Sequence, residues 1–509
     1  MLTEYMIIME KKLQELRNIL SEVYDLEKIG ALLWWDQATY MPPGGAEARS
    51  RQEALLGRLA HEMFIQPQVG RLLDALHPYE ESLPYGSDDA SLIRVARREY
   101  ERLTRVPPSF TAELSAHAAD FYQAWSEARP ANDFKSLHTM MEKSLDFSRQ
   151  YSNFFPGYAH ILDPIIDLED EGMTVASIKS LFTELHGQLV PLVKKITAFP
   201  LVDDSCLHRN YPEALQVEFT NRLVERLGYD FKRGRCDKTL HPFETAFSIG
   251  DVRITTRIFE NNLVECLLGT VHEAGHGMYE QGISRALEGT PLAGGASAGL
   301  HESQSRLWEN VVGRSREFWE FCFPLLQQAF PEQLVGTSLD EFHRAINKVA
   351  RTLIRTEADE VTYDLHVMLR FDFEVALLEG TLAVGDLAEA WRERYRSDLG
   401  IAPPDDRDGV MQDVHWFAGT IGGNFQGYTL GNILAAQFFK EALKANPEIP
   451  DQMRSGSFET LHRWLIENIY IHGHKFTAPE LVERVTGGPV RIQPYIDYLN
   501  AKYGQLYQI

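Results

Sequence analysis

Two histidines and a glutamate lie together in the segment His272-Glu273-Ala274-Gly275-His276. Side chains four residues apart on a helix lie on the same face, one turn from each other, so the two imidazoles can bind one metal ion. Glu273 is then placed to take a proton from a water on that ion. Zinc lowers the pKa of its bound water to about 7, so the segment predicts a hydrolytic metal centre.

The residues before this segment predict that it lies on a buried helix. Apolar side chains recur at helical spacing from Phe259 to Val271, and Gln281-Gly282 is typical of a helix C-terminus. Two histidines and a glutamate buried there without a ligand would cost free energy. We therefore interpret the segment as the HEXXH motif of zinc metallopeptidases rather than as a pair of core histidines.

A catalytic zinc needs a third protein ligand, which must come from another part of the chain. The extended HEXXHxxGxxH pattern is excluded because Gly282 stands where its third histidine would be. Glu280 lies one turn past the motif and Glu288 lies in a loop rich in Gly and Pro. Glu302 opens a predicted helix and Glu309 shares its face. We favour Glu302, and spacing alone leaves Glu309 as the alternative.

Composition excludes several classes of function. Acidic residues outnumber basic ones by 73 to 50, for a net charge of −23, which argues against binding the phosphate backbone of nucleic acids. We find neither an apolar run long enough for a membrane span nor a secretory signal. The four cysteines form no CxxC pair. We expect a soluble cytoplasmic protein with no nucleic-acid or membrane partner.

Helical periodicity dominates the chain, and extended structure is predicted only for 241–257, where Pro242 blocks a helix and β-branched residues follow. We expect a mainly α protein with a small β element beside the metal helix, forming one catalytic domain over residues 1–509. The other helices are predicted near residues 13–26, 91–128, 135–155, 177–197, 213–228, 303–330, 339–379, 386–398, 428–445, 456–471 and 491–505.

Six short blocks occur in a fixed order along the chain. They are HPF (241–243), DVRIT (251–255), HEAGH (272–276), HESQ (301–304), IRTEAD (354–359) and GVMQDVHW (409–416). Together they match the patterns HPF, DXRXT, HEXXH, HES/GQ, I/NRXXA/SD and GXXQDXHW without a departure. The sequence therefore resembles the thermostable carboxypeptidase 1 family, the Taq-type zinc metallocarboxypeptidases, over nearly its whole length.

This resemblance implies a helical, neurolysin-like gluzincin fold with a deep groove, of which residues 1–200 or so form one wall. It implies removal of single residues from free peptide C-termini with broad preference, proline being disfavoured, by a homodimer. His272, His276 and Glu302 become the ligands of one Zn²⁺ per chain, which Co²⁺ can replace. Glu273 becomes the general base.

An enzyme that acts at a peptide C-terminus must bind a free carboxylate, and arginine does so with two parallel donors. The candidates are Arg253 in the strand-like block and Arg355, which we place in the long predicted helix. The alternative for each is an ordinary ion pair, with Asp251 for Arg253 and with Asp359 for Arg355. Spacing permits both pairs.

The oxyanion formed in peptide hydrolysis needs hydrogen-bond donors where its charge develops. His415 is expected to serve because its block matches the family pattern, and Tyr428 by the looser analogy of a late His and Tyr opposite the metal in gluzincins. Both could instead serve packing beside the glycine-rich segment 419–427. His241 is a candidate to hydrogen-bond the substrate backbone, or has a structural role before Pro242.

Two other functions remain open at this point. The same catalytic residues in an open groove would make an oligopeptidase or dipeptidase that cleaves short peptides internally. A helical scaffold with a structural metal site is a third interpretation. Glu273 argues against it, because a structural zinc needs no neighbouring base and usually has four protein ligands.

Overall fold

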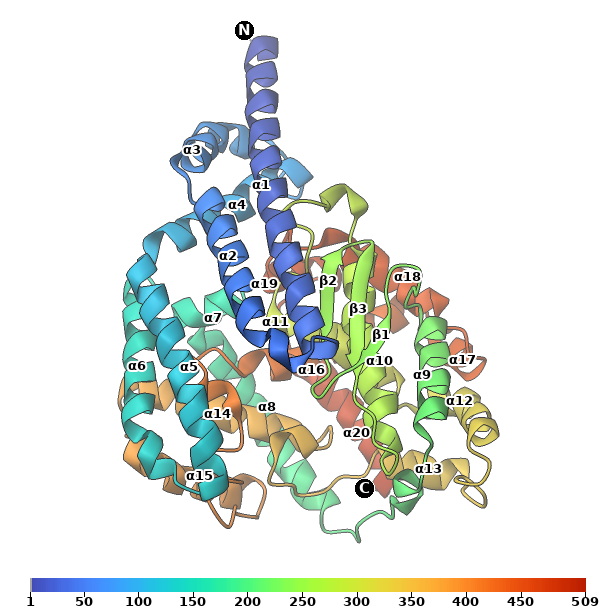
Figure 1. The fold of residues 1–509 in the computed structure, drawn as a ribbon. Coiled ribbons are helices and arrows are strands. Elements are labelled where there is room, and N and C mark those ends of the chain that lie inside the picture. The colour runs from blue at the N-terminus through green and yellow to red at the C-terminus, as the bar shows by residue number, and fades with distance from the viewer. Residues whose placement is uncertain (1) are drawn as a thin grey trace.

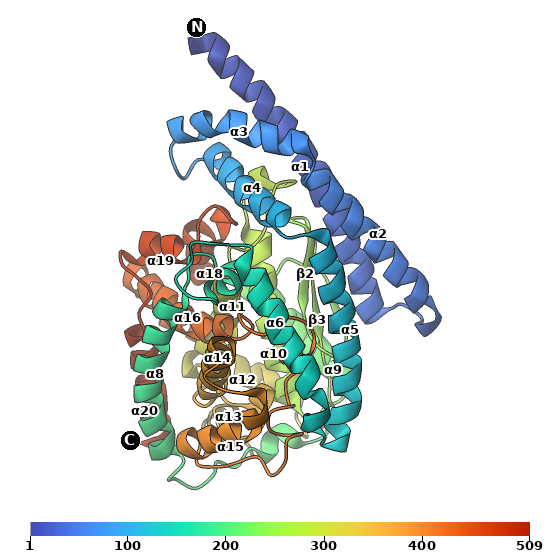
Figure 2. The same ribbon diagram turned by 90° about the vertical axis from the view of Figure 1, so that its left-hand side faces the viewer.

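A computed structural model describes residues 2–509, and these residues are mainly helical, with one small sheet and several irregular connections (Figures 1 and 2). The mainly α prediction with a small β element is confirmed. No helix within residues 2–509 has both the length and the apolar character needed to cross a membrane.

The N-terminal helices form a group of their own at one end of the molecule (Figure 1). α1 (Leu2–Thr39) and α2 (Ala46–Phe64) pack along each other, since Pro42 and Pro43 end α1 and turn the chain back. α3 (Pro67–Ser82) and α4 (Asp88–Arg105) complete the group. Their buried faces share an apolar cluster with the segment that follows the metal helix.

Two further apolar clusters hold the rest of the helices together. One surrounds α8 and α14, and the other surrounds α10, which carries the HEXXH segment. The bounds are α5 (Pro108–Ala131), α6 (His138–Asn153), α7 (Asp163–Glu169), α8 (Val175–Ile196), α9 (Glu213–Leu227), α10 (Leu263–Gly282), α11 (Ala298–Arg306), α12 (Arg316–Ala329), α13 (Leu339–Ile346), α14 (Tyr363–Glu379), α15 (Leu387–Asp398), α16 (Gln426–Ala445), α17 (Ile449–Arg454), α18 (Glu459–Asn468), α19 (Ala478–Thr486) and α20 (Gln493–Tyr507).

The sheet has three strands in the order β1-β3-β2. β2 (Glu244–Ser248) and β3 (Asp251–Thr256) pair antiparallel inside the predicted extended segment, and β1 (Cys236–Lys238) adds a parallel edge that the sequence prediction missed. α10 packs against β3, and α1 packs against β2. The sheet therefore separates the metal helix from the N-terminal helices.

Glycine lets three helices approach each other around the metal segment. A Cβ on Gly275 of α10 would lie 2.6 Å from the Cα of Ser305 on α11. A Cβ on Gly431 of α16 would lie 2.5 Å from Cγ of Glu302, also on α11. α11 is thus in close contact with both neighbours, and this contact brings Glu302 beside the two histidines.

Three predicted helices are wrong as single elements. The predicted helix 91–128 is two helices, because Pro107 and Pro108 interrupt it. The predicted helix 303–330 consists of α11, a π-helical turn (Leu307–Val312) and α12, which starts afresh because Ser315 caps its N-terminus.

The predicted helix 339–379 also breaks, into α13 and α14 with an irregular segment between them. Arg355 lies in a short 3-10 turn (Arg355–Glu357) rather than in a long helix. The Asp359 carboxylate accepts the backbone N–H groups of Ala350, Val361 and Thr362. Those bonds compete with helical ones and fix the irregular path.

Candidate metal centre

His272, His276 and Glu302 form a group that can hold a metal ion, their ligand atoms all lying within 4.8 Å of one another. Glu302 Oε2 lies 3.8 Å from Nε2 of His272 and 3.5 Å from Nε2 of His276. Ligands at 2.0–2.2 Å from a tetrahedral zinc would be roughly 3.4 Å apart. Two imidazoles and one carboxylate therefore fit a catalytic metal that keeps one position open, and Glu302 rather than Glu309 completes the group.

The other ring nitrogen of each histidine has its own partner. His272 Nδ1 lies 2.9 Å from a carboxylate oxygen of Glu309, and His276 Nδ1 lies 2.5 Å from Nδ1 of His301. His301 in turn lies 3.0 Å from Glu280 through its Nε2. Such partners orient a ligating imidazole and leave Nε2 free for the ion. Glu309 and Glu280, both considered as ligands from spacing, thus support the ligands instead.

Arg306 joins the two acidic residues of this centre. Its Nε donates to Glu302 at 2.7 Å and its Nη1 to Glu309 at 3.1 Å. Burial alone would raise the pKa of Glu302, but the charges of Arg306 and His272 and a hydrogen bond with His276 hold it well below its usual range. Burial lowers the pKa of His276 to about 3. The centre therefore offers a charged carboxylate and a neutral imidazole, as a cation requires.

Glu273 lies among these groups with its side chain almost fully buried. Burial raises the pKa of its carboxyl to about 7, the charges of Glu302 and Glu309 raising it further and His272 opposing them. A carboxyl with this pKa can both accept and return a proton near neutral pH.

Arg355 pairs with Asp413 and not with Asp359, so the ion pair considered as the alternative to substrate binding is not formed. Its Nε and Nη2 donate to the Asp413 carboxylate at 3.0 and 2.7 Å, and Nη1 donates to Tyr363 at 2.9 Å. The change of partner follows from the irregular path between α13 and α14, along which the Asp359 oxygens already bind backbone N–H groups.

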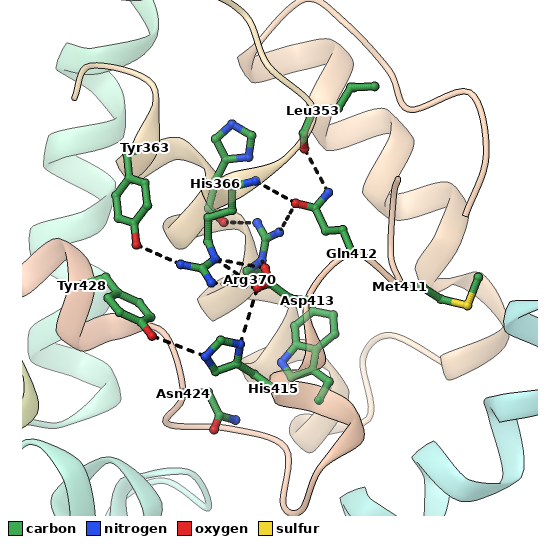
Figure 3. Close-up of polar contacts among 12 residues, drawn as sticks. Leu353, Tyr363, His366, Arg370, Met411, Gln412, Asp413, His415, Asn424 and Tyr428 are labelled. Atoms are coloured by element: carbon green, nitrogen blue, oxygen red, sulfur yellow. Dashed lines mark hydrogen bonds and ion pairs between the residues drawn. The ribbon is translucent and has the colours of Figure 1, made fainter. Parts of the chain in front are cut away.

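The same Asp413 also meets the block that carries His415. Figure 3 shows Asp413 between Arg370 and His415, with Tyr428 on the far side of the imidazole. His415 Nδ1 lies 3.5 Å from Asp413 Oδ1, and the Tyr428 hydroxyl lies 3.4 Å from His415 Nε2. The Arg355 guanidinium lies 5.0 Å from the centre of the Tyr428 ring. Three predicted site residues, Arg355, His415 and Tyr428, are therefore brought together.

This second cluster adjoins the metal centre through Tyr363. The Arg306 guanidinium lies 4.7 Å above the Tyr363 ring, while the hydroxyl of that ring accepts from Arg355. Burial raises the pKa of Tyr428, and among the nearby charges Glu302 raises it further. Tyr428 and the metal ligand Glu302 thus share one electrostatic environment.

Arg253 lies in a different setting. Both oxygens of Asp251 accept from it, at 2.9 and 2.8 Å, so the ion pair considered as the alternative to substrate binding is present. Its guanidinium lies 4.4 Å from the ring centre of Trp35 on α1 and 4.8 Å from that of Phe247 on β2. Arg253 therefore connects the sheet to the N-terminal helices.

His241 lies exposed just before β2. Its pKa is lowered by partial desolvation and by nearby positive charge, from Arg257 first and then from His415 and Arg355. His241 is therefore a neutral donor or acceptor on the side of the Arg355 cluster.

Sequence reasoning missed the residues that support the site. Arg306 and His301 flank Glu302, and helical spacing alone would place Arg306 one turn from it. Arg370 gave no such signal, because its partner Asp413 is 43 residues away.

These features define a helical metallopeptidase of the HEXXH class whose third ligand is a glutamate on the following helix. Residues 15–503 match the family described as carboxypeptidase Taq (M32) metallopeptidase. The chain belongs to this family, as the six sequence blocks predicted, and it is therefore a metallocarboxypeptidase, a peptide hydrolase that releases C-terminal residues.

Individual relatives agree over their full length. The chain is 40% identical to thermostable carboxypeptidase 1 of Thermus thermophilus over 508 residues, covering 98% of this chain and 99% of that one. It is 36% identical to carboxypeptidase 1 of Bacillus subtilis over 498 residues, with 97% and 98% covered. The crystal structure of an M32 carboxypeptidase from Deinococcus radiodurans superposes with a TM-score of 0.95 at 47% identity, covering 98% of this chain and 100% of that one.

Proposed function

We propose that this carboxypeptidase uses zinc, one ion per chain, with cobalt able to replace it. We further propose that it removes single residues from free peptide C-termini with broad preference and disfavours proline. One observation carries the proposal: the arginine cluster around Arg355 adjoins the His272–His276–Glu302 group through Tyr363. The anchor would then hold the C-terminal carboxylate of the substrate, and the metal-activated water would face the peptide bond one residue before it.

Arg355 is the proposed anchor for the substrate carboxylate. A guanidinium has five N–H groups, and Asp413 and Tyr363 take three of those on Arg355. One N–H on Nη1 and one on Nη2 are left for a further acceptor. A substrate carboxylate could use both, which is the geometry that arginine favours.

Glu273 is the proposed general base. A bound metal ion would polarise both the attacking water and the scissile carbonyl. Glu273 takes a proton from the water as the water oxygen forms a bond to the carbonyl carbon. Glu273 then gives this proton to the amide nitrogen as the C–N bond breaks, and the last residue leaves as a free amino acid while the water oxygen stays in the new C-terminal carboxylate.

His415 and Tyr428 are the proposed donors to the oxyanion that forms between these two steps. They lie next to each other, 3.4 Å apart, and beside Arg355. Anchoring of the C-terminal residue would direct the scissile carbonyl oxygen, which belongs to the residue before it, toward this pair. Arg253 and His241 are proposed to contact the substrate farther from the scissile bond. Arg253 would use the part of its guanidinium that Asp251 and Trp35 do not cover, and His241 would bind the peptide backbone.

The family resemblance supports a wider proposal for the whole chain. We infer a single catalytic domain over residues 1–509, with residues 1–200 or so forming one wall of a groove, in a cytoplasmic homodimer. Trp34 of α1 packs against Phe243 of the HPF block, their ring centres 4.4 Å apart, which is consistent with N-terminal helices that border the site.

Peptide laddering tests the proposal directly. The zinc-loaded protein would be incubated with a pool of peptides, each made with a free and with an amidated C-terminus, and the products followed by mass spectrometry. We expect stepwise loss of single residues from the free peptides, a halt before proline and little change in the amidated ones. Internal cleavage of both sets would instead identify an oligopeptidase.

A further inference from the structure

Arg370 is a fully buried arginine next to the proposed substrate anchor. It lies on α14 with 0% of its side chain exposed. Its Nε donates to Asp413 Oδ2 at 2.6 Å, its Nη2 to Gln412 at 2.8 Å and its Nη1 to the backbone oxygen of His366 at 2.6 Å (Figure 3). The guanidinium also lies 4.7 Å from the Trp391 ring centre. Arg370 therefore cannot touch a substrate.

Asp413 has two arginine partners where one would satisfy it. Arg355 already binds this carboxylate through two nitrogens. A buried charge costs free energy unless it is compensated, so a second buried arginine needs a reason beyond pairing with Asp413. The reason concerns the charge of the group as a whole.

The two arginines and one aspartate together carry a net charge of +1. Arg355 and Asp413 without Arg370 would form a neutral pair, which attracts a carboxylate only weakly. His366 does not alter this sum, since burial and the charges of Arg370 and Arg355 hold its pKa well below the usual range. Arg370 is completely enclosed, whereas Arg355 keeps 6% of its side chain exposed, so only Arg355 can present the excess positive charge to a substrate.

Gln412 links the two arginines mechanically as well. Its Oε1 accepts both Nη2 of Arg370 and the backbone N–H of Arg355, at 2.8 and 2.9 Å. Its Nε2 donates to the backbone oxygens of Leu353 and Asp408. The turn that carries Arg355 is thus fixed to the side chain of Arg370.

We propose that Arg370 is a positioning residue for C-terminal carboxylate recognition: it compensates Asp413 from the buried side, so that Arg355 is held by Asp413 and still attracts the substrate's carboxylate. This inference rests on the proposed role of Arg355 as the anchor. It assigns specificity for a free C-terminus to a charge that the substrate never contacts.

Ligand binding to the metal-loaded enzyme tests this inference without turnover. The probes are a slowly cleaved N-acyl dipeptide with a C-terminal proline and its C-terminal amide, used as competitive inhibitors. Arg370→Gln should weaken binding of the acid by about tenfold, equivalent to ~1.4 kcal/mol, and leave binding of the amide unchanged. Arg370→Lys, which keeps the charge, should restore most of the preference for the acid. In steady-state assays the Gln variant should raise KM more than it lowers kcat.

Two further variants make the outcome decisive. Arg394→Gln removes a cation from the adjacent helix α15, where it pairs with Asp372 and Asp398, and should leave the acid-to-amide ratio unchanged. Gln412→Glu keeps an acceptor for Arg370 and adds a negative charge, but removes the Nε2 donor to Leu353 and Asp408. It should weaken binding of the acid more than that of the amide, even if Arg370→Gln does not fold. Equal weakening of acid and amide by Arg370→Gln, or no effect of Gln412→Glu on the acid, would overturn the inference.

Arg355→Gln separates this inference from the proposed function. An unchanged acid-to-amide ratio in that variant would refute Arg355 as the anchor. A lost preference in Arg355→Gln together with a normal ratio in Arg370→Gln would leave the anchor in place and refute only the role of Arg370.

Discussion

His276 and His301 face each other through their Nδ1 atoms, which lie 2.5 Å apart. Only one of two such nitrogens can donate a hydrogen. When His276 binds a cation through Nε2, its Nδ1–H must donate, and Nδ1 of His301 must accept. His301 then carries its hydrogen on Nε2 and donates it to Glu280, 3.0 Å away. His276 is thus oriented through another histidine, His301, whereas His272 contacts the carboxylate of Glu309 directly.

Replacing His301 with phenylalanine should weaken metal binding, since His276 loses the acceptor that fixes its tautomer. Loss of such a partner typically costs 10- to 100-fold in metal affinity, and we expect a loss of about that size here. Competition with chelators of graded affinity measures it. His77→Phe, at a half-exposed histidine on α3, is the matched control. An affinity equal to that of the wild type would contradict this role for His301.

Glu302 and Glu309 should respond differently to removal. Glu302→Ala deletes a ligand and should leave the protein without stoichiometric metal. Glu309→Ala deletes only the support behind His272 and should still bind one ion, with lower affinity. Metal content after gel filtration distinguishes the two variants. The ligand assignment would be wrong if Glu309→Ala lost the ion and Glu302→Ala kept it.

Gly275 should tolerate no side chain, although it lies between the motif histidines on a regular helix. A Cβ there would meet the α11 backbone at Ser305, 2.6 Å away, and would push Glu302 from the histidines. We expect Gly275→Ala to lower the free energy of unfolding by about 1–3 kcal/mol and to weaken metal binding. Gly269→Ala on the same helix has nothing within 4 Å and should be neutral or stabilise by about 0.5–1 kcal/mol. Similar behaviour of the two variants would refute the close contact between the helices.

The charge of Asp413 should make a pH-dependent contribution to stability. Burial would raise its pKa, but Arg370, a hydrogen bond with His415 and Arg355 hold it well below the usual range. A depressed pKa in the folded state stabilises above the unfolded-state value of about 3.9, and this stabilisation is lost as the pH falls through the folded-state pKa. Asp413→Asn should therefore lower the free energy of unfolding at pH 7 by about 3–5 kcal/mol.

Urea unfolding of both proteins over a range of pH measures this difference. The difference in unfolding free energy should stay constant from pH 7 to about pH 5. It should narrow in stronger acid, once Asp413 begins to protonate in the unfolded wild-type chain while it is still charged in the folded protein. Asp451→Asn, at an exposed aspartate on α17, should show no comparable effect. A difference that grew as the pH fell would contradict the depressed pKa.

The sequence predicted most of the metal centre because its chemistry is local. His272, Glu273 and His276 lie within two helical turns, and Glu302 could be chosen because the sequence placed it at the start of the next helix, although α11 in fact begins four residues earlier, at Ala298. The supports of the ligands were less predictable. Glu309 appeared only as a rival ligand, because a π-helical turn that spacing did not reveal aims it at Nδ1 of His272.

The second cluster was hidden by tertiary structure. Periodicity continued through 339–379 and placed Arg355 on a helix beside Asp359, but the Asp359 carboxylate binds backbone N–H groups and breaks that helix. Arg355 then meets Asp413, 58 residues later, which no local pattern could indicate. Gly275 is likewise required because α11 packs close to it, and nothing in the sequence of its own helix indicates this contact.

The role of Glu273 is the central claim, and one variant tests it most directly. Glu273→Gln keeps the shape of the side chain and every metal ligand but cannot take a proton from water. We expect this variant to bind one metal ion per chain with normal affinity and to hydrolyse a free-carboxyl peptide about 10²- to 10⁴-fold more slowly. Full activity in the metal-loaded variant would contradict the proposed mechanism.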